Sequence, residues 1–239
     1  MVCLMEKAAT KIDSNHTYRY ERKFQVRELS VSEIESIVRL HPASFCRQFP
    51  TRIINNIYFD TRNLNAVIEN IEGIAKRLKT RIRWYGESFG KVTSPVLELK
   101  IKNGFAGRKK YFSLEPFSLN SDFTSDYFRN HIKESALPEN IKRHLDLLLP
   151  ILLNNYTRQY YLSKCEKFRL TIDNQLYNYR IGERFNSFKF VSSDRLSTIL
   201  ELKYDVEDEA VADTITKHFP LRVTKYSKYI NGVQQILML

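Results

Sequence analysis

The sequence lacks the features that mark disulfide-rich, zinc-finger and membrane-spanning proteins. Its 239 residues include only three cysteines, Cys3, Cys46 and Cys165, which are odd in number and far apart in the chain. This usage argues against a disulfide framework or a Cys-rich zinc site. The longest apolar run, LDLLLPILL at 145–153, is too short to cross a bilayer and is broken by Pro150. Since the N-terminal residues also lack the apolar core of a signal peptide, we expect a soluble, cytoplasmic protein without a transmembrane segment.

Several common catalytic motifs are missing as well. The five histidines show no metal-ligand spacing, and the chain has neither a GxSxG elbow nor a Cys/His catalytic signature. The segment NGFAGRKK, residues 103–110, is glycine-containing and basic, but it lacks the GxxxxGK[ST] pattern of a phosphate-binding loop. We interpret it as a hairpin turn.

Acidic residues are scarce relative to basic ones. The chain has 38 lysines and arginines against 27 aspartates and glutamates, a formal net charge of +11. Such a balance predicts attraction to a polyanion: nucleic acid, a phosphorylated metabolite, polyphosphate or an acidic membrane. Composition alone does not distinguish among these partners. The 43% of hydrophobic residues are ample for a folded core.

The order of strand and helix patterns indicates an α+β domain with an antiparallel sheet. Residues 1–15 are polar and aperiodic, and we expect a disordered leader there, followed by a single domain over 16–239. Alternation and turn signals predict strands over 17–27, 53–61, 79–86, 94–104, 107–115, 156–163, 168–175, 188–193 and 197–205. Helical spacing and caps predict helices over 30–40, 63–73, 138–153 and 208–219, one within 116–136, and one after residue 225.

Cations share one face of the strand KTRIRWYG, residues 79–86. Lys79, Arg81 and Arg83 alternate with Ile82 and Trp84, so the two sets point to opposite faces. A single strand of this kind is normally half-buried with its charges in water. The pattern recurs, however, in Arg19 with Glu21 and Lys23, Glu98 with Lys100 and Lys102, Arg108 with Lys110, Arg158 among Tyr156 and Tyr160, Arg169 with Thr171 and Asp173, and Glu201 with Lys203.

Two arrangements satisfy this recurring pattern. The charged faces are either exposed to water on an open sheet, or they face one another inside a closed β-barrel with the helices packed outside. The second arrangement makes a charged tunnel. Because basic groups outnumber acidic ones, such a tunnel needs a bound polyanion, and sparse glutamates among many cations suit a divalent metal ion bridging phosphate oxygens.

The ordered motifs RYERKF, NNIYFDT, RIRWYG, LELKIKNG, YTRQYY, RLTID, LELKYD and VTKYSKYINGV together resemble the VTC domain. This domain is the polyphosphate polymerase branch of the triphosphate tunnel metalloenzymes, and the resemblance covers residue 18 to the C-terminus. It implies an antiparallel β-barrel or tunnel that binds ATP and polyphosphate or another inorganic polyanion, with Mn or Mg as cofactor. No nucleic-acid partner is expected.

The resemblance also implies roles for individual residues. We expect catalytic positions at Lys23, Arg81, Arg83, Lys100, Arg158, Arg169 and Lys203. We expect substrate or product contacts at Arg19, Arg108, Lys110, Lys225, Ser227 and Lys228. Glu201 is the expected metal ligand, with Glu98 assisting. Lys225 and Lys228 lie near the predicted start of the last helix, where backbone N–H groups favour an anion and the helix dipole disfavours cations.

One departure from the superfamily affects the expected reaction. The first strand of the wider superfamily reads ExExK, whereas this chain has Arg19, Glu21 and Lys23. Losing the first carboxylate weakens a hydrolase or cyclase assignment and fits the more basic polymerase branch. A triphosphatase of the same fold and a non-catalytic polyphosphate-binding module remain the alternatives. Regulation, and any membrane-protein partner, cannot be transferred from the resemblance.

Overall fold

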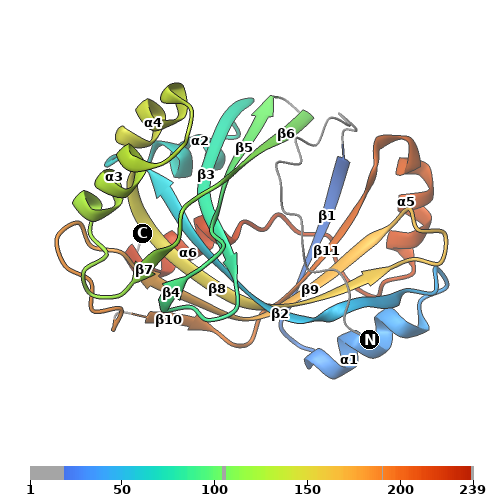
Figure 1. Cartoon of the computed structure of the whole chain (residues 1–239). Helices are drawn as coiled ribbons and strands as arrows, with labels where there is room; N and C mark the ends of the chain where they lie inside the picture. The colour runs from blue at the N-terminus through green and yellow to red at the C-terminus, as the bar shows by residue number, and fades with distance from the viewer. Residues whose placement is uncertain (1–18, 104–105, 190, 238–239) are drawn as a thin grey trace, which may run out of the picture.

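The computed structural model describes residues 19–103, 106–189 and 191–237, so the expected leader at 1–15 lies outside the described residues. One large antiparallel sheet dominates the fold, in the order β1-β11-β9-β8-β2-β3-β5-β6, with β10 paired to β9 (Figure 1). Its strands are β1 (Arg19–Val26), β2 (Cys46–Asp60), β3 (Lys76–Tyr85), β5 (Val96–Asn103), β6 (Ala106–Ser113), β8 (Leu149–Leu162), β9 (Arg169–Arg180), β10 (Val191–Asp194) and β11 (Thr198–Asp205). A separate ribbon pairs β4 (Gly90–Val92) with β7 (Phe117–Leu119).

The helices are α1 (Val31–Leu40), α2 (Asn65–Ile71), α3 (Ser125–Glu134), α4 (Glu139–Asp146), α5 (Glu209–Lys217) and α6 (Lys228–Leu237). A capping box starts α1: the Ser30 hydroxyl accepts from the Glu33 backbone N–H, and the Glu33 carboxylate accepts from the Ser30 backbone N–H. Gly73, at a positive φ of 75°, follows the end of α2. No helix of the described residues is both long and apolar enough to cross a membrane.

The predicted helix over 138–153 was wrong in its second half. Helix α4 ends at Asp146, and the following LPILL belongs to β8, which pairs with β2 from Leu149 onward. Pro150 explains the change, because it lacks the N–H that a helix interior needs. In the sheet it lies opposite Phe59, beside a register shift that tolerates the missing donor.

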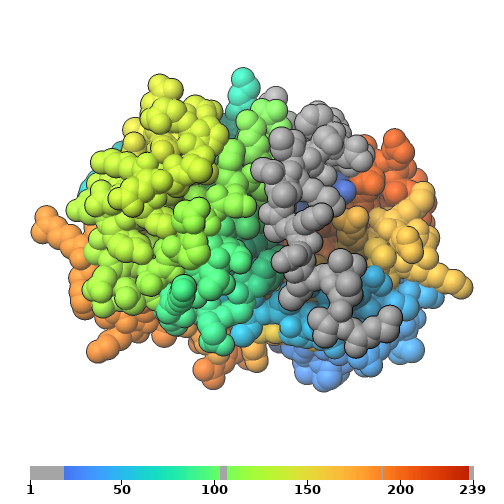
Figure 2. Space-filling model, in the orientation of Figure 1, coloured from blue at the N-terminus to red at the C-terminus, as the bar shows by residue number. Residues whose placement is uncertain are grey.

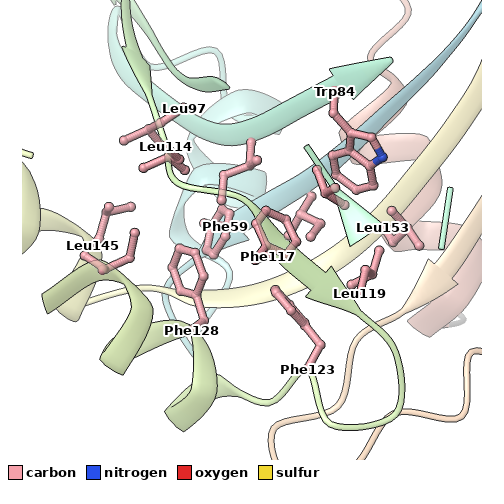
Figure 3. Packing of buried hydrophobic residues seen from close by; sticks show 14 of the residues in the cluster. Phe59, Trp84, Leu97, Leu114, Phe117, Leu119, Phe123, Phe128, Leu145 and Leu153 are labelled. Atoms are coloured by element: carbon pink, nitrogen blue, oxygen red, sulfur yellow. The ribbon is translucent and has the colours of Figure 1, made fainter. Parts of the chain in front are cut away.

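The convex face of the sheet carries two hydrophobic layers. One buries Trp84, Leu97 and Leu153 of the sheet against α3, α4 and the β4–β7 ribbon. Figure 3 shows its aromatic centre, where Phe117, Phe123 and Phe128 lie between helix and sheet. The other layer packs α1 and α5 on the strands β1, β9 and β11. The helices that cover the two layers lie on opposite sides of the molecule: Figure 2 shows the yellow-green surface of α3 and α4 on one side, and the blue and orange surfaces of α1 and α5 on the other.

The concave face receives α6, and α2 packs beside it. Gly232 lets this helix approach the sheet closely, since a Cβ there would lie 2.6 Å from both the Asn178 Oδ1 and the Leu152 Cδ2 atoms. Tyr229 and Val233 complete a small hydrophobic cluster with Leu152. The packing fixes the N-terminal end of α6 against the concave face, where the charged side chains gather.

The α+β class and the antiparallel sheet are confirmed, but the sheet is not a strictly closed barrel. No backbone ladder among the described residues joins the edge strands β1 and β6. Side chains bridge the opening instead: the Lys100 Nζ atom of β5 lies 3.4 Å from the Glu21 Oε1 atom of β1. The sheet therefore forms a strongly curved trough. Its two sides are joined by an ion pair between side chains rather than by hydrogen bonds between strands.

Phe123 tests the convex core. Its ring is fully buried and contacts Phe117 and Phe128, so Phe123→Ala should lower the free energy of unfolding by about 3–5 kcal/mol. Phe185→Ala is the matched control, because that ring is 68% exposed and its loss should change stability by less than about 0.5 kcal/mol. Urea denaturation of both variants measures the difference; equal stabilities would contradict the assigned core.

Candidate functional site

A basic cavity of about 220 Å³ lies on the concave face. It is lined by Glu21, Lys23, Tyr58, Asn70, Arg77, Lys79, Arg81, Arg83, Lys100, Lys102, Lys109, Tyr156, Arg158, Glu201, Lys203, Tyr226, Ser227, Lys228 and Tyr229. Eleven of these residues are lysines or arginines and two are glutamates. The lining carboxylates cannot neutralise so many cations, so the cavity has the electrostatics of a polyanion-binding site.

Strands β3 and β5 hold two arginines around one buried carboxylate. Arg81 lies opposite Glu98 in the ladder, and its Nε and Nη2 atoms donate to the Glu98 Oε2 atom at 2.8 and 2.5 Å. The Arg83 Nη1 atom lies 3.4 Å from Glu98 Oε1, and its Nε donates to Asn56. Burial works to raise the pKa of Glu98, but the two arginines prevail and lower it to about 2. Glu98 thus orients the two arginines, and it does not line the cavity itself.

A second buried carboxylate organises the opposite wall. Asp173 of β9 is fully buried and accepts two hydrogen bonds from Arg158 of β8, at 2.5 and 2.6 Å. Lys228, at the start of α6, donates to the same carboxylate at 2.5 Å. Burial opposes the charge on Asp173, yet these two cations hold its pKa below the ordinary value. The close packing of α6 therefore positions one cavity cation directly.

Glu201 and Glu21 form the candidate metal site. Glu201 is buried, 3.3 Å from the Lys203 Nζ atom and 3.7 Å from the Arg158 Nη2 atom. The carboxylate of Glu21 interacts directly with that of Glu201. Burial favours the protonated form of both, but Lys203 and Lys23 lower the pKa of Glu201 well below its ordinary value.

Two adjoining carboxylates in a cationic cavity suit a divalent ion such as Mg or Mn, which binds through one or two carboxylates and takes its other ligands from phosphate oxygens and water. No group of three or more His, Cys, Asp or Glu side chains suited to a metal occurs in the part of the chain that the structure describes. Glu21 and Glu201 therefore fit a metal that is completed by its substrate. The sequence suggested Glu201 with Glu98; Glu98 does not line the cavity, and its role at a metal stays a prediction.

Lys79 has an unusually acidic ammonium group. Its Nζ atom donates to the Ser227 hydroxyl at 3.2 Å. Burial, with help from the nearby charges of Lys100 and Lys23, lowers its pKa from 10.5 to about 7. The pKa of Lys109 is also lowered to about 7, but its side chain is exposed to water, which screens the effect. Lys79 is therefore the clearer reporter of charge crowding in the cavity.

The structure brings most of the expected site residues together. Lys23, Arg81, Arg83, Lys100, Arg158, Lys203, Glu201, Ser227 and Lys228 line the cavity, and Glu98 lies directly behind two of them. Five expected residues are exposed and do not line it: Arg19, Arg108, Lys110, Arg169 and Lys225.

The ladder registers explain four of these five positions. Arg108 and Lys110 lie opposite Ile101 and Leu99, so they belong to the convex face. Arg169 shares the concave face with Lys203 but lies at the end of its strand, beyond the cavity. Arg19 lies at the same end of the strands as Arg169, and its Nε atom is 3.2 Å from the Asp205 Oδ1 atom. Lys225 precedes α6.

Further lining residues escaped the site assignment: Glu21, Asn70, Arg77, Lys79, Lys102, Lys109 and the four tyrosines. Lys79 and Lys102 belonged to the alternating rows and followed from period 2. Lys109 needed the hairpin register, in which it lies opposite Lys100. Asn70 and Tyr229 come from helices, so strand alternation gave no signal for them.

Lys79 predicts how phosphate binding depends on pH. Between pH 7 and about 10 the unfolded chain binds more protons at this lysine than the folded one, so the free energy of unfolding of the ligand-free protein should rise with pH. A bound polyanion raises the pKa again. Tripolyphosphate binding at pH 8 should therefore take up about one proton, and its affinity should fall as pH rises through this window.

Titration calorimetry in two buffers of different ionisation enthalpy measures this uptake. Lys79→Met should reduce it strongly, whereas Lys91→Met, a change at an exposed lysine outside the cavity lining, should not. Proton release on binding, or uptake that persists in Lys79→Met, would contradict the assignment.

Comparison with solved structures finds chains that are similar to this one, including these three. A candidate adenylate cyclase from Vibrio parahaemolyticus is similar in structure, with a TM-score of 0.51 and 12% identity, over 91% of this chain and 99% of that one. A protein from Pyrococcus horikoshii has a TM-score of 0.46 and 15% identity, over 92% and 98%. A candidate adenylyl cyclase from Hippeastrum, described as having a dominant triphosphatase activity, has a TM-score of 0.46 and 14% identity, over 88% and 93%.

No curated protein sequence matches the chain. The family comparison is more specific: the sequence model of the VTC domain matches residues 18–237, nearly the whole chain. That match covers every strand of the trough and every cation of the cavity lining. The chain therefore belongs to the VTC domain family.

Proposed function

We propose that the protein is a metal-dependent polyphosphate polymerase, which transfers the γ-phosphoryl group of ATP to the end of a growing polyphosphate chain. The row of cations along β3 carries this proposal. Arg77, Lys79, Arg81 and Arg83 all line the cavity at alternate positions. Three two-residue steps along a strand span about 20 Å, which is longer than the phosphate chain of one nucleotide. A polymer of phosphates would cover the whole row.

In the proposed reaction, a terminal oxygen of the polyphosphate acceptor attacks the γ-phosphorus of ATP. A new P–O bond forms, the bond from the γ-phosphorus to the β-phosphate oxygen breaks, and ADP leaves with that electron pair. The protein has to align two polyanions and to reduce the repulsion between them. Glu98 orients Arg81 and Arg83, and Asp173 orients Arg158. The three arginines are therefore preorganised to donate to phosphate oxygens.

The state of the cavity carboxylates favours phosphate over water as the nucleophile. Water needs a base to remove its proton, but Glu21 and Glu201 in the cavity, like Glu98 behind it, are ion-paired and have lowered pKa values, which makes them weak bases. A terminal phosphate is already an anion and needs no base. It needs neighbouring cations, and the cavity is rich in them.

A divalent ion, Mn or Mg, would be held by Glu21 and Glu201. When bound, the ion supplies positive charge to the phosphate oxygens during transfer. Lys23 and Lys203 flank the two glutamates and would share the same phosphate groups. The cations face a cavity and not an outer surface, which suits a thin inorganic chain better than a nucleic-acid strand. Use of ATP would place the activity in the cytoplasm.

Product analysis tests the proposal. Purified protein given ATP and Mn should make a ladder of phosphate polymers on a gel. Glu201→Gln and Glu21→Gln should each lower polymer formation by about 100-fold or more, the usual effect of losing one preorganised electrostatic group. Tripolyphosphate should still bind both variants without metal, because the cations remain. Glu207→Gln, a change at an exposed glutamate outside the cavity, is the matched control.

Other outcomes would point to the competing functions. Release of orthophosphate without any polymer would favour a triphosphatase. Binding of polyphosphate without turnover of ATP would favour a non-catalytic binding module.

A further inference from the structure

An aromatic cluster surrounds Arg52 beside the basic cavity. The guanidinium carbon of Arg52 lies 5.1 Å from the ring centre of Phe49, 5.5 Å from that of Tyr85 and 5.7 Å from that of Tyr160. Phe49 and Tyr160 also meet edge to face, with 5.7 Å between their ring centres. These four residues, here called the aromatic mouth, lie outside the residues that line the cavity.

The aromatic mouth continues the concave face beyond the phosphate-binding arginines. Arg52 is the cross-strand partner of Arg158. Tyr85 follows Arg83 by two residues on β3, and Tyr160 follows Arg158 by two residues on β8. Side chains two residues apart lie on the same face, with about 6.6–6.8 Å between their Cα atoms. A ligand with phosphates on Arg83 and Arg158 would therefore reach the aromatic mouth with its next group.

The cluster leaves binding capacity unused. Phe49 is 50% exposed and Tyr85 is 54% exposed, so large areas of both rings face water. Within the described part of the chain, no group accepts a hydrogen bond from the Arg52 guanidinium or forms an ion pair with it, and its aromatic contacts are with the three rings. Exposed aromatic rings beside an unpaired guanidinium are the elements that bind a planar base next to a phosphate.

The other end of the cation row has a different composition. On β3 the row runs from Arg83, next to the aromatic mouth, to Arg77. There Arg77 lies opposite Lys102 of β5, and both line the cavity. Paired cations suit a chain that carries phosphate groups alone. The cavity is therefore asymmetric, with aromatic rings at one end and cations at the other.

We propose that the aromatic mouth binds the purine base of the nucleotide donor. Phe49 and Tyr85 stack on the base, and Arg52, between the rings and Arg158, contacts the ribose and the α-phosphate. The nucleotide therefore enters at this end, and the polyphosphate chain extends toward Arg77 and Lys102. This inference rests on the proposed function, because it takes a nucleoside triphosphate as the donor of the phosphoryl group.

Binding measurements with three ligands test the aromatic mouth: ATP, UTP and tripolyphosphate, compared by titration calorimetry in the absence of turnover. Tyr85→Ala and Phe49→Ala should each weaken ATP binding by roughly 10-fold, the effect of losing one stacking partner. Both should leave tripolyphosphate binding unchanged, because it has no base. Wild type should prefer ATP to UTP, and the alanine variants should reduce that preference.

Two further variants separate stacking from general damage. Tyr85→Phe keeps the ring and should keep the affinity for ATP. Phe185→Ala removes an exposed ring from a loop outside both the cavity lining and the aromatic mouth, and should change nothing. Equal losses for ATP and tripolyphosphate, no loss for either, or equal affinity of wild type for ATP and UTP would overturn the proposal.

The binding result is independent of the reaction catalysed. If ATP binding depends on Tyr85 and Phe49 but no polymer forms, the aromatic mouth stands and the polymerase assignment fails. If polymer forms but ATP affinity does not depend on either ring, the polymerase assignment is supported and the aromatic mouth is not the base-binding site.

Discussion

The excess of positive charge on the concave face is the constraint on which the rest of the structure depends. Eleven cations line one cavity with two carboxylates among them. Like charges held this close repel one another, and this repulsion adds to the effect of burial in lowering the pKa of Lys79 to about 7. Such an arrangement persists only if strong packing elsewhere holds the strands in place. A bound polyanion would remove the strain and would be attracted by the same charges.

Packing on the convex face supplies that support. Two hydrophobic layers clamp the two halves of the sheet from outside, while α6 is held against the inside by the close contact at Gly232. The buried carboxylates then divide the labour. Glu98 and Asp173 orient arginines, whereas Glu21 and Glu201 meet in the cavity as a pair that suits a metal ion. Since β1 and β6 are not paired among the described residues, charge also links the two ends of the trough.

Alternation along strands was enough to predict much of this site. It identified the rows containing Arg81, Arg83 and Lys203, because a period of 2 fixes which side chains share a face. It failed where the answer depended on pairing between strands. Lys109 lines the cavity and Arg108 does not, because the hairpin places Lys109 opposite Lys100. Local pattern also mistook LPILL for helix, since only the partner strand β2 reveals it as β8. Arg169 is on the concave face but does not line the cavity, because the position of each strand along the trough is likewise set by tertiary structure.

A crystal structure with bound tripolyphosphate tests the central claim most directly, because the claim is that the concave cations exist to hold a phosphate chain. The account predicts phosphate groups inside the trough, within hydrogen-bond distance of Arg81, Arg83 and Arg158, with the chain axis following the β3 row toward Arg77. Phosphate bound only to exposed lysines and arginines outside the trough, with the cavity cations unengaged, would contradict it.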